Sequence, residues 1–125
     1  MTSLTQLLNV IRDVSHQAEL RLKTRMVNLD EKIIIIVDTA GVERKDINIE
    51  IVQTKVKIRA KRFDPFPEFA TDSPNEIVYG ELVRDITIPI CVISQNDVVI
   101  EYENGLLTIT INRNDPINNG FTFKV

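Results

Sequence analysis

The chain is 125 residues long, with 43% hydrophobic residues, 26% charged residues and a formal net charge of −3. This composition is that of one globular domain rather than of a disordered chain. The acidic balance argues against a nucleic-acid-binding protein, which normally carries a basic surface, and gives no support for binding to anionic lipid. Because no run of about 18 apolar residues occurs, the sequence predicts no membrane-spanning helix.

The chain contains one cysteine, Cys91, and one histidine, His16. A single thiol can form neither a disulfide framework nor a cysteine-rich zinc site, which favours a reducing compartment, the cytosol. Because Cys91 lies just past an apolar strand, we expect a buried, unreactive thiol. One histidine supplies no catalytic pair, and no nucleophile, phosphate-binding or calcium-binding motif is present. The sequence therefore predicts no enzyme, metal, cofactor or small-molecule substrate.

Residues 1–25 show the spacing of an amphipathic helix. Apolar side chains recur every three or four positions at Leu4, Leu7, Leu8, Ile11, Val14, Ala18 and Leu22. This stripe either packs on its own domain or contacts another chain, the sheet or a ligand, because no second helix is available as a partner. We predict an N-terminal helical arm over residues 1–25.

Short β-strands are predicted from residue 26 to residue 111. Lys32 to Val37 contains four consecutive isoleucines, whose β-branched side chains suit a buried strand. Residues 47–51 and 55–59 alternate apolar and polar side chains, as strands with one apolar face do. The pair Gln53-Thr54 between them is a candidate tight turn.

The strongest turn signal is Asn104-Gly105, which lies between the apolar segments 98–102 and 106–111. Both residues tolerate positive φ, so the pair predicts a β-hairpin. Another strand covers 82–88 and is expected to end at Pro89, which cannot donate a ladder hydrogen bond. Several short strands with frequent turns predict an all-β protein, an antiparallel β-sandwich.

A proline-containing stretch from Phe63 to Tyr79 interrupts these strands. Its three prolines do not suit a central strand, and it also carries Phe63, Phe66, Phe69 and Tyr79. A free surface loop rarely holds so many aromatic residues. The stretch therefore either folds back on its own sandwich or crosses to a partner as an edge strand.

Residues 112–125 combine a polar linker with an apolar end. Phe121, Phe123 and Val125 alternate with polar residues and so share one side of an extended segment. Such a segment is either the last strand of the same domain or a tethered plug for a groove elsewhere. A stretch of this length reaches at most ~46–50 Å, far enough to contact another subunit.

Four segments, in order and spacing, resemble the small heat-shock protein (α-crystallin) family. They are Val37 to Val42 followed by Asp46-Ile47, Ile58 to Arg62, Arg84 to Pro89, and Tyr102 to Leu107. Ala40 stands where the family has proline, and Ile100 and Leu106 stand where it has alanine and valine. The resemblance covers residues 26–111 and implies an immunoglobulin-like β-sandwich, the α-crystallin domain, between the helical arm and a flexible tail over 112–125.

The resemblance implies an ATP-independent holdase chaperone that works as a homo-oligomer and binds apolar segments of unfolding proteins. The client-binding residues would be Leu4, Leu7, Leu8, Ile11 and Val14. The tail anchor, Phe123-Lys124-Val125 or Phe121-Thr122-Phe123 in a shifted register, has phenylalanine where the family has isoleucine. It would enter a groove on a neighbouring dimer, which we expect to be formed by Ile47, Ile49, Ile51 and Val99.

The same resemblance implies a dimer in which a strand from the 63–79 stretch pairs with the first strand of the partner. The implied interface residues are Val27, Leu29, Phe66, Phe69, Tyr79 and Arg84. Arg84 is either an arginine whose charge pair orders the dimer or a plain surface arginine. An alternative function is that of a CS-domain-like co-chaperone, an adapter sandwich that binds a larger chaperone, although that class lacks the arm and the terminal anchor.

Overall fold

The computed structural model describes residues 20–69 and 75–113. In chain order these residues form β1 (Thr24–Asn28), β2 (Lys32–Asp38), η1 (Arg44–Asp46), β3 (Ile47–Arg62), η2 (Pro67–Phe69), β4 (Gly80–Val92), η3 (Gln95–Asp97), β5 (Val98–Glu103) and β6 (Leu106–Asn112), where η marks a short 3-10 helix.

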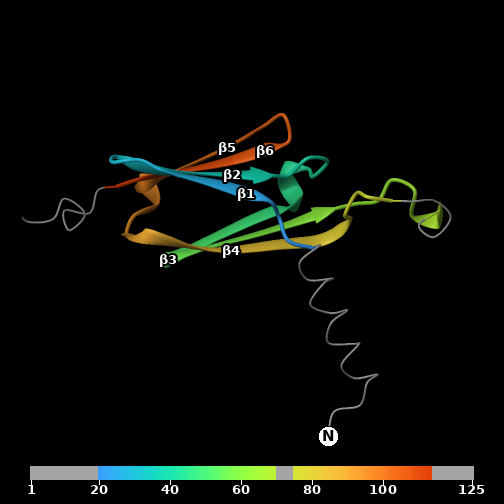
Figure 1. Cartoon of the computed structure of the whole chain (residues 1–125), viewed down its shortest axis with the longest axis horizontal. Coiled ribbons are helices and arrows are strands. Elements are labelled where there is room, and N and C mark those ends of the chain that lie inside the picture. The colour runs from blue at the N-terminus through green and yellow to red at the C-terminus, as the bar shows by residue number, and fades with distance from the viewer. Residues whose placement is uncertain (1–19, 70–74, 114–125) are drawn as a thin grey trace, which may run out of the picture.

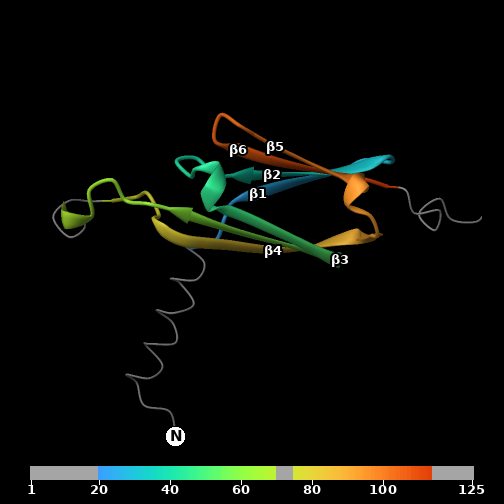
Figure 2. The same ribbon diagram turned by 180° about the vertical axis from the view of Figure 1, so that it is seen from behind.

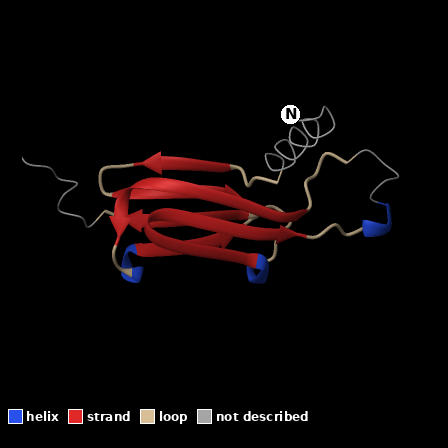
Figure 3. Cartoon of the chain, turned by 90° about the horizontal axis from the view of Figure 1, so that it is seen from below, coloured by secondary structure: helices blue, strands red, loops and turns tan. Residues whose placement is uncertain are grey.

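The strands form two layers (Figures 1 and 2). The large sheet has the strand order β1-β2-β6-β5, and the small sheet is made by β3 and β4. Each pairing between these strands is antiparallel, which confirms the predicted antiparallel β-sandwich. Figure 3 shows the three short helices at the ends and edges of the sandwich rather than over its faces.

The core lies between the two sheets and follows the two-residue period of the strands. The central strands of the large sheet contribute the buried residues Ile33, Ile35, Val37, Leu107, Ile109 and Ile111. The small sheet contributes Val56, Ile58, Ala60, Leu82, Ile88 and Ile90. Each such isoleucine, leucine or valine side chain contributes roughly 1.5–3 kcal/mol of burial free energy. Ile34 and Ile36 point to the opposite side and are only half-buried, so β2 is a buried strand on one face only.

The chain enters the sandwich earlier than the predicted arm allows. The Leu22 amide donates to the Val83 carbonyl at 3.0 Å, and the Val83 amide donates to the Leu20 carbonyl at 3.1 Å. Residues 20–22 therefore run beside β4, and Leu22 is buried in the core instead of lying on a helical stripe. Since β1 begins at Thr24, the last residues of the segment 1–25 belong to the sandwich, and residues 1–19 lie outside the described part.

Strand β3 folds back on itself. At its end, the Arg62 Nε donates to the Ala40 carbonyl at 2.7 Å, and Ala40 lies shortly before Ile47, where β3 begins. A straight strand of 16 residues would span about 50 Å, farther than residues 40–47 can reach. The β3 ribbon doubles back along its length (Figure 1). Gln53 has a φ of 55° and the pairing with β4 is irregular between Gln53 and Lys55, in agreement with the turn predicted at Gln53-Thr54.

The predicted hairpin at Asn104-Gly105 is confirmed. Both residues have positive φ, 54° and 77°, and Glu103 pairs with Leu106 across the turn, as expected for a two-residue hairpin loop. The turn also contacts the chain after β2. The Gly105 carbonyl accepts hydrogen bonds from the buried Thr39 hydroxyl at 3.0 Å and from the Thr39 amide at 2.9 Å.

Two local expectations are wrong. β4 continues through Pro89 to Val92 instead of ending at the proline. In the ladder between β3 and β4, Lys55 pairs with Thr87 and Gln53 pairs with Val92. Pro89 lies between these two pairs, where the register is interrupted, so its missing amide hydrogen breaks no ladder hydrogen bond. Cys91 is exposed rather than buried, because the alternation of β4 turns its neighbour Ile90 toward the core.

A substitution pair tests the contact between the two turns. A Cβ on Gly105 would lie 3.1 Å from the Ala40 Cα, whereas a Cβ on Gly80 would meet no atom within 4 Å. Both glycines have positive φ, which costs an alanine about 1–2 kcal/mol. We therefore expect Gly105→Ala to lower the free energy of unfolding by at least about 1 kcal/mol more than Gly80→Ala does. Urea unfolding measures the difference, and equal losses would show that the backbone contact contributes nothing.

Candidate functional site

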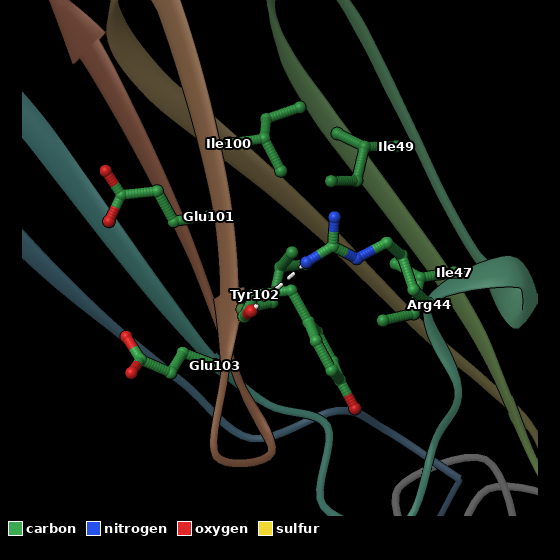
Figure 4. A pocket seen from close by; sticks show the side chains of 8 residues that line it. Arg44, Ile47, Ile49, Ile100, Glu101, Tyr102 and Glu103 are labelled. Atoms are coloured by element: carbon green, nitrogen blue, oxygen red, sulfur yellow. Dashed lines mark hydrogen bonds between the residues drawn. The ribbon is translucent and has the colours of Figure 1, made fainter.

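An apolar groove runs between the edges of the two sheets. One wall is the first half of β3, and the other is the inner side of β5, the last strand of the large sheet. The groove consists of two adjoining cavities, of about 610 and about 380 Å³, which share Ile49 and Ile100. Figure 4 shows these two side chains facing each other across the larger cavity. The other apolar lining residues are Ile47, Ile51, Val92, Ile93, Val98, Tyr102 and Leu107.

The structure brings three of the four predicted groove residues together, Ile47, Ile49 and Ile51. Val99, the fourth, is not among the lining residues. It pairs with Thr110, whose neighbours Ile109 and Ile111 are buried, so Val99 points to the outer face of the large sheet. Its neighbours Val98 and Ile100 take the place expected for it, and the alternation of residues 98–102 could have shown this.

Arg44 and Tyr102 form one end of the groove (Figure 4). The guanidinium carbon lies 5.8 Å from the centroid of the Tyr102 ring, and the Nη2 donates to the Tyr102 carbonyl at 3.4 Å. The Tyr102 hydroxyl donates to the Val42 carbonyl, which fixes the ring. An exposed cation–π contact of this kind contributes about 0.5–1 kcal/mol. Glu101 and Glu103 also line this cavity, so this end of the groove carries charges of both signs, whereas the cavity near Ile93 is lined by uncharged side chains.

Large apolar side chains of the groove are open to solvent within the described residues. Ile100 is 51% exposed and Ile93 is 83% exposed. Contiguous exposed apolar surface of this kind marks a site of protein contact. An extended segment suits the groove best, because alternate side chains of such a segment can enter adjoining cavities.

A third cavity, of about 630 Å³, lies at the base of the 63–79 stretch. Arg62 holds this base together, since it donates to the Val78 carbonyl at 3.0 Å as well as to Ala40. Of the predicted dimer residues, Tyr79 lines this cavity. Phe66 and Phe69 are 63% and 55% exposed, so the described part of the stretch leaves its aromatic residues uncovered.

The remaining predicted dimer residues lie at the β1 edge and on β4. Val27 is half-buried on β1, the edge strand of the large sheet, and Leu29 follows it and is exposed. Arg84 is half-buried, and its Nε has no hydrogen-bond partner among the described residues. Burial lowers the pKa of Arg84, and the nearby charge of Arg21 lowers it further. Among the described residues, the charged group near Arg84 is therefore another cation, and no carboxylate pairs with it.

Several predictions concern residues outside the described part of the chain. The client-binding residues Leu4, Leu7, Leu8, Ile11 and Val14, and the anchor residues Phe121, Phe123 and Val125, lie there, so their roles stay predictions. Within residues 20–69 and 75–113, no group of three or more His, Cys, Asp or Glu side chains is arranged so that it could hold a metal ion. Within the same ranges no helix is long and apolar enough to cross a membrane.

Comparison with known proteins identifies the fold. The model of the Hsp20/alpha crystallin family matches residues 25–122. Heat shock protein 16.0 from Schizosaccharomyces pombe is 21% identical, with a TM-score of 0.66 over 84% of this chain and 94% of that chain. The Del-C4 mutant of hsp14.1 from Sulfolobus solfataricus P2 is 21% identical, with a TM-score of 0.65 over 85% of this chain and 94% of that chain.

A small heat-shock protein from Xylella fastidiosa is 16% identical, with a TM-score of 0.64 over 83% of this chain and 93% of that chain. No curated protein sequence matches the chain. The family match covers well over half of the chain and includes the walls of the groove, the 63–79 stretch and Arg84. The chain therefore belongs to the Hsp20/alpha crystallin family, the family of the small heat-shock proteins.

Proposed function

We propose that the protein is an ATP-independent holdase, a chaperone that binds exposed apolar segments of unfolding proteins and prevents their aggregation. Membership of the small heat-shock protein family supports the chaperone role. The observation that carries the holdase mechanism is the open apolar groove between β3 and β5. Binding to the unfolded state keeps a client in solution by mass action and needs no nucleotide. With its single cysteine, the protein fits the reducing cytosol.

The groove has two classes of occupant in this mechanism. One is the tail of a neighbouring subunit, anchored through Phe123 and Val125, or through Phe121 and Phe123. The other is an apolar segment of a client. Burial of two or three side chains gives roughly 1.5–3 kcal/mol each before ordering costs, so one docked tail is held weakly. Many docked tails in a closed oligomer add through effective concentration, which permits both a stable assembly and the exchange of tails for clients.

The building block of this oligomer is a dimer formed through the 63–79 stretch and β1. β1 is an edge strand with backbone groups free to pair, and Phe66 and Phe69 are exposed apolar side chains that pairing would cover. Arg84 supports the same interface, because its unpartnered Nε and its cationic neighbour Arg21 favour an anion from another chain.

The alternative, an adapter sandwich that binds a larger chaperone, requires a monomer without tail anchoring. Light scattering on a model client, heated with the protein in the absence of ATP, separates the two. A holdase suppresses the scattering in proportion to its concentration. Unchanged scattering at stoichiometric protein, together with a monomeric mass, would favour the adapter.

Substitution of Ile100 tests the groove. A carboxylate in the apolar groove remains unpaired when a segment docks, so we expect Ile100→Glu to weaken client protection about tenfold or more. Val52→Glu is the matched control, because Val52 is 52% exposed on β3 and lines neither groove cavity. Equal protection by the two variants would show that the groove takes no part in client binding.

Removal of the tail separates assembly from client binding. In a chain that ends at Arg113, the hydrogen bonds of Arg113 to Glu31 and Asn28 are kept, so the sandwich stays intact. We expect this chain to form smaller assemblies in size-exclusion chromatography with light scattering, while its vacant grooves still protect the client. An unchanged assembly mass would exclude the tail as an anchor.

Substitution of Arg84 separates an interface arginine from a surface arginine. Because the buried Arg84 Nε has no partner among the described residues and the charge of Arg21 is nearby, Arg84→Ala should leave the unfolding temperature of the sandwich unchanged or raised. Loss of an interchain charge pair should nevertheless raise the dimer dissociation constant about tenfold or more. Arg59→Ala, on an exposed residue of β3, is the control. If both variants dimerise like the unmodified chain, Arg84 is a surface arginine.

A further inference from the structure

The outer face of the large sheet carries an unexpected row of apolar residues. The strand register places Val27, Ile34, Thr110 and Val99 side by side across all four strands. The next row consists of Arg25, Ile36, Thr108 and Glu101. These residues point away from the core, because their neighbours in β2 and β6 are the fully buried ones. We call this surface the outer face.

The centre of the outer face is apolar. A sheet with one face in water normally places polar residues on that side, but β2 places Ile34 and Ile36 there. Val99 and Leu106 are each 47% exposed on the same face. No described element lies over these strands (Figures 1 and 2). The outer face is thus an unpartnered apolar surface separate from the groove.

The two edges of the outer face carry opposite charges. The β1 edge has Arg25 and Lys23, and Lys23 is placed there by the hydrogen bond from the Asp38 amide to its carbonyl, 2.9 Å. The β5 edge has Glu101 and Glu103, whose carboxylates point away from the groove (Figure 4). In the described part of the chain, these four side chains form no ion pair with one another.

Arg25 and Glu101 form no ion pair within the described part of one chain. Arg25 and Glu101 lie three strand spacings apart, about 14 Å. A partner that pairs with both edges must therefore present acidic side chains opposite the β1 edge and basic side chains opposite the β5 edge. A second copy of the same sheet meets this requirement when it is turned by 180° about an axis parallel to the strands.

We propose that the outer face packs against the outer face of a second copy of this chain. The two-fold rotation reverses the strand order and keeps the rows in register. Arg25 then faces Glu101 of the second copy, Val27 faces Val99, and the isoleucines of β2 face the threonines of β6. Such a contact is isologous, so each charge pair occurs twice. Two sheets stacked in this way lie ~10 Å apart, with strands about 30° from parallel.

This contact joins building blocks rather than forming them. A patch four short strands wide buries less than the roughly 1,000 Å² of a stable pair, so it is weak alone and gains strength in an oligomer. Its central residues Val27, Ile34, Ile36 and Val99 line none of the three cavities, so the contact can coexist with a docked tail and with the dimer. Residues 20–22, the first that the structure describes, are bonded to the small sheet and not to the outer face.

A charge exchange tests the contact in the full chain. We expect R25E and E101R, each alone, to raise the concentration at which the largest assembly dissociates about tenfold, because each introduces two like-charge contacts. The double variant R25E/E101R restores both pairs with reversed polarity, so its assembly should dissociate within about threefold of the unmodified chain. Dilution series with light scattering measure the assembly, and R59E, a charge reversal on β3 of the small sheet, is the control.

Several results would overturn the contact. Single variants that assemble like R59E would show that the edge charges meet nothing. A double variant as weak as the single variants would show that Arg25 and Glu101 do not face each other. If a peptide of residues 112–125 binds the unmodified chain and binds the R25E variant more weakly, the tail and not a second copy occupies the outer face. In each case Ile100→Glu still reports on the groove, so the holdase proposal is judged separately.

Discussion

The two-residue alternation of the β-strand is the constraint on which the structure depends. In a sandwich of two sheets, alternation buries one side of every strand and leaves the other side to water or to another chain. The inner sides of β2 and β6 are buried in one core together with apolar side chains of β3 and β4. The two layers remain separate at the β5 edge, and the apolar side chains that project into that gap form the groove. The same alternation that completes the core therefore leaves the groove open.

Much of the fold could be predicted because its signals are local. Asn104-Gly105 needs only positive φ at two residues, and the alternation of β3 can be seen within a few positions. The misplaced features depend on distant partners. Pro89 is tolerated because β3 shifts its register opposite it, and Leu22 leaves the helical pattern because it pairs beside Val83. The local sequence pattern around Pro89 or Leu22 does not reveal which distant residue will lie beside it.

The candidate site was predictable to the same extent. Ile47, Ile49 and Ile51 form a plain apolar face, so the β3 wall could be found from the sequence. The polar end could not, because Arg44 lies on a three-residue helix and meets Tyr102 only through the packing of the two layers. The neighbourhood of Arg84 and Arg21 has the same origin, since residues 20–22 were expected in a helix.

Three apolar surfaces of the sandwich face different directions: the groove at the β5 edge, the aromatic stretch over 63–79, and the outer face of the large sheet. The groove and the outer face lie on different sides of the large sheet, so a single protomer cannot cover one of them with the other. Several weak contacts can, however, be made at once in a closed oligomer, where each raises the effective concentration for the next. Loss of one contact then exposes apolar surface without dispersing the assembly. The proposed holdase must offer such surface to unfolding clients and conceal it otherwise, and this division of contacts meets both requirements.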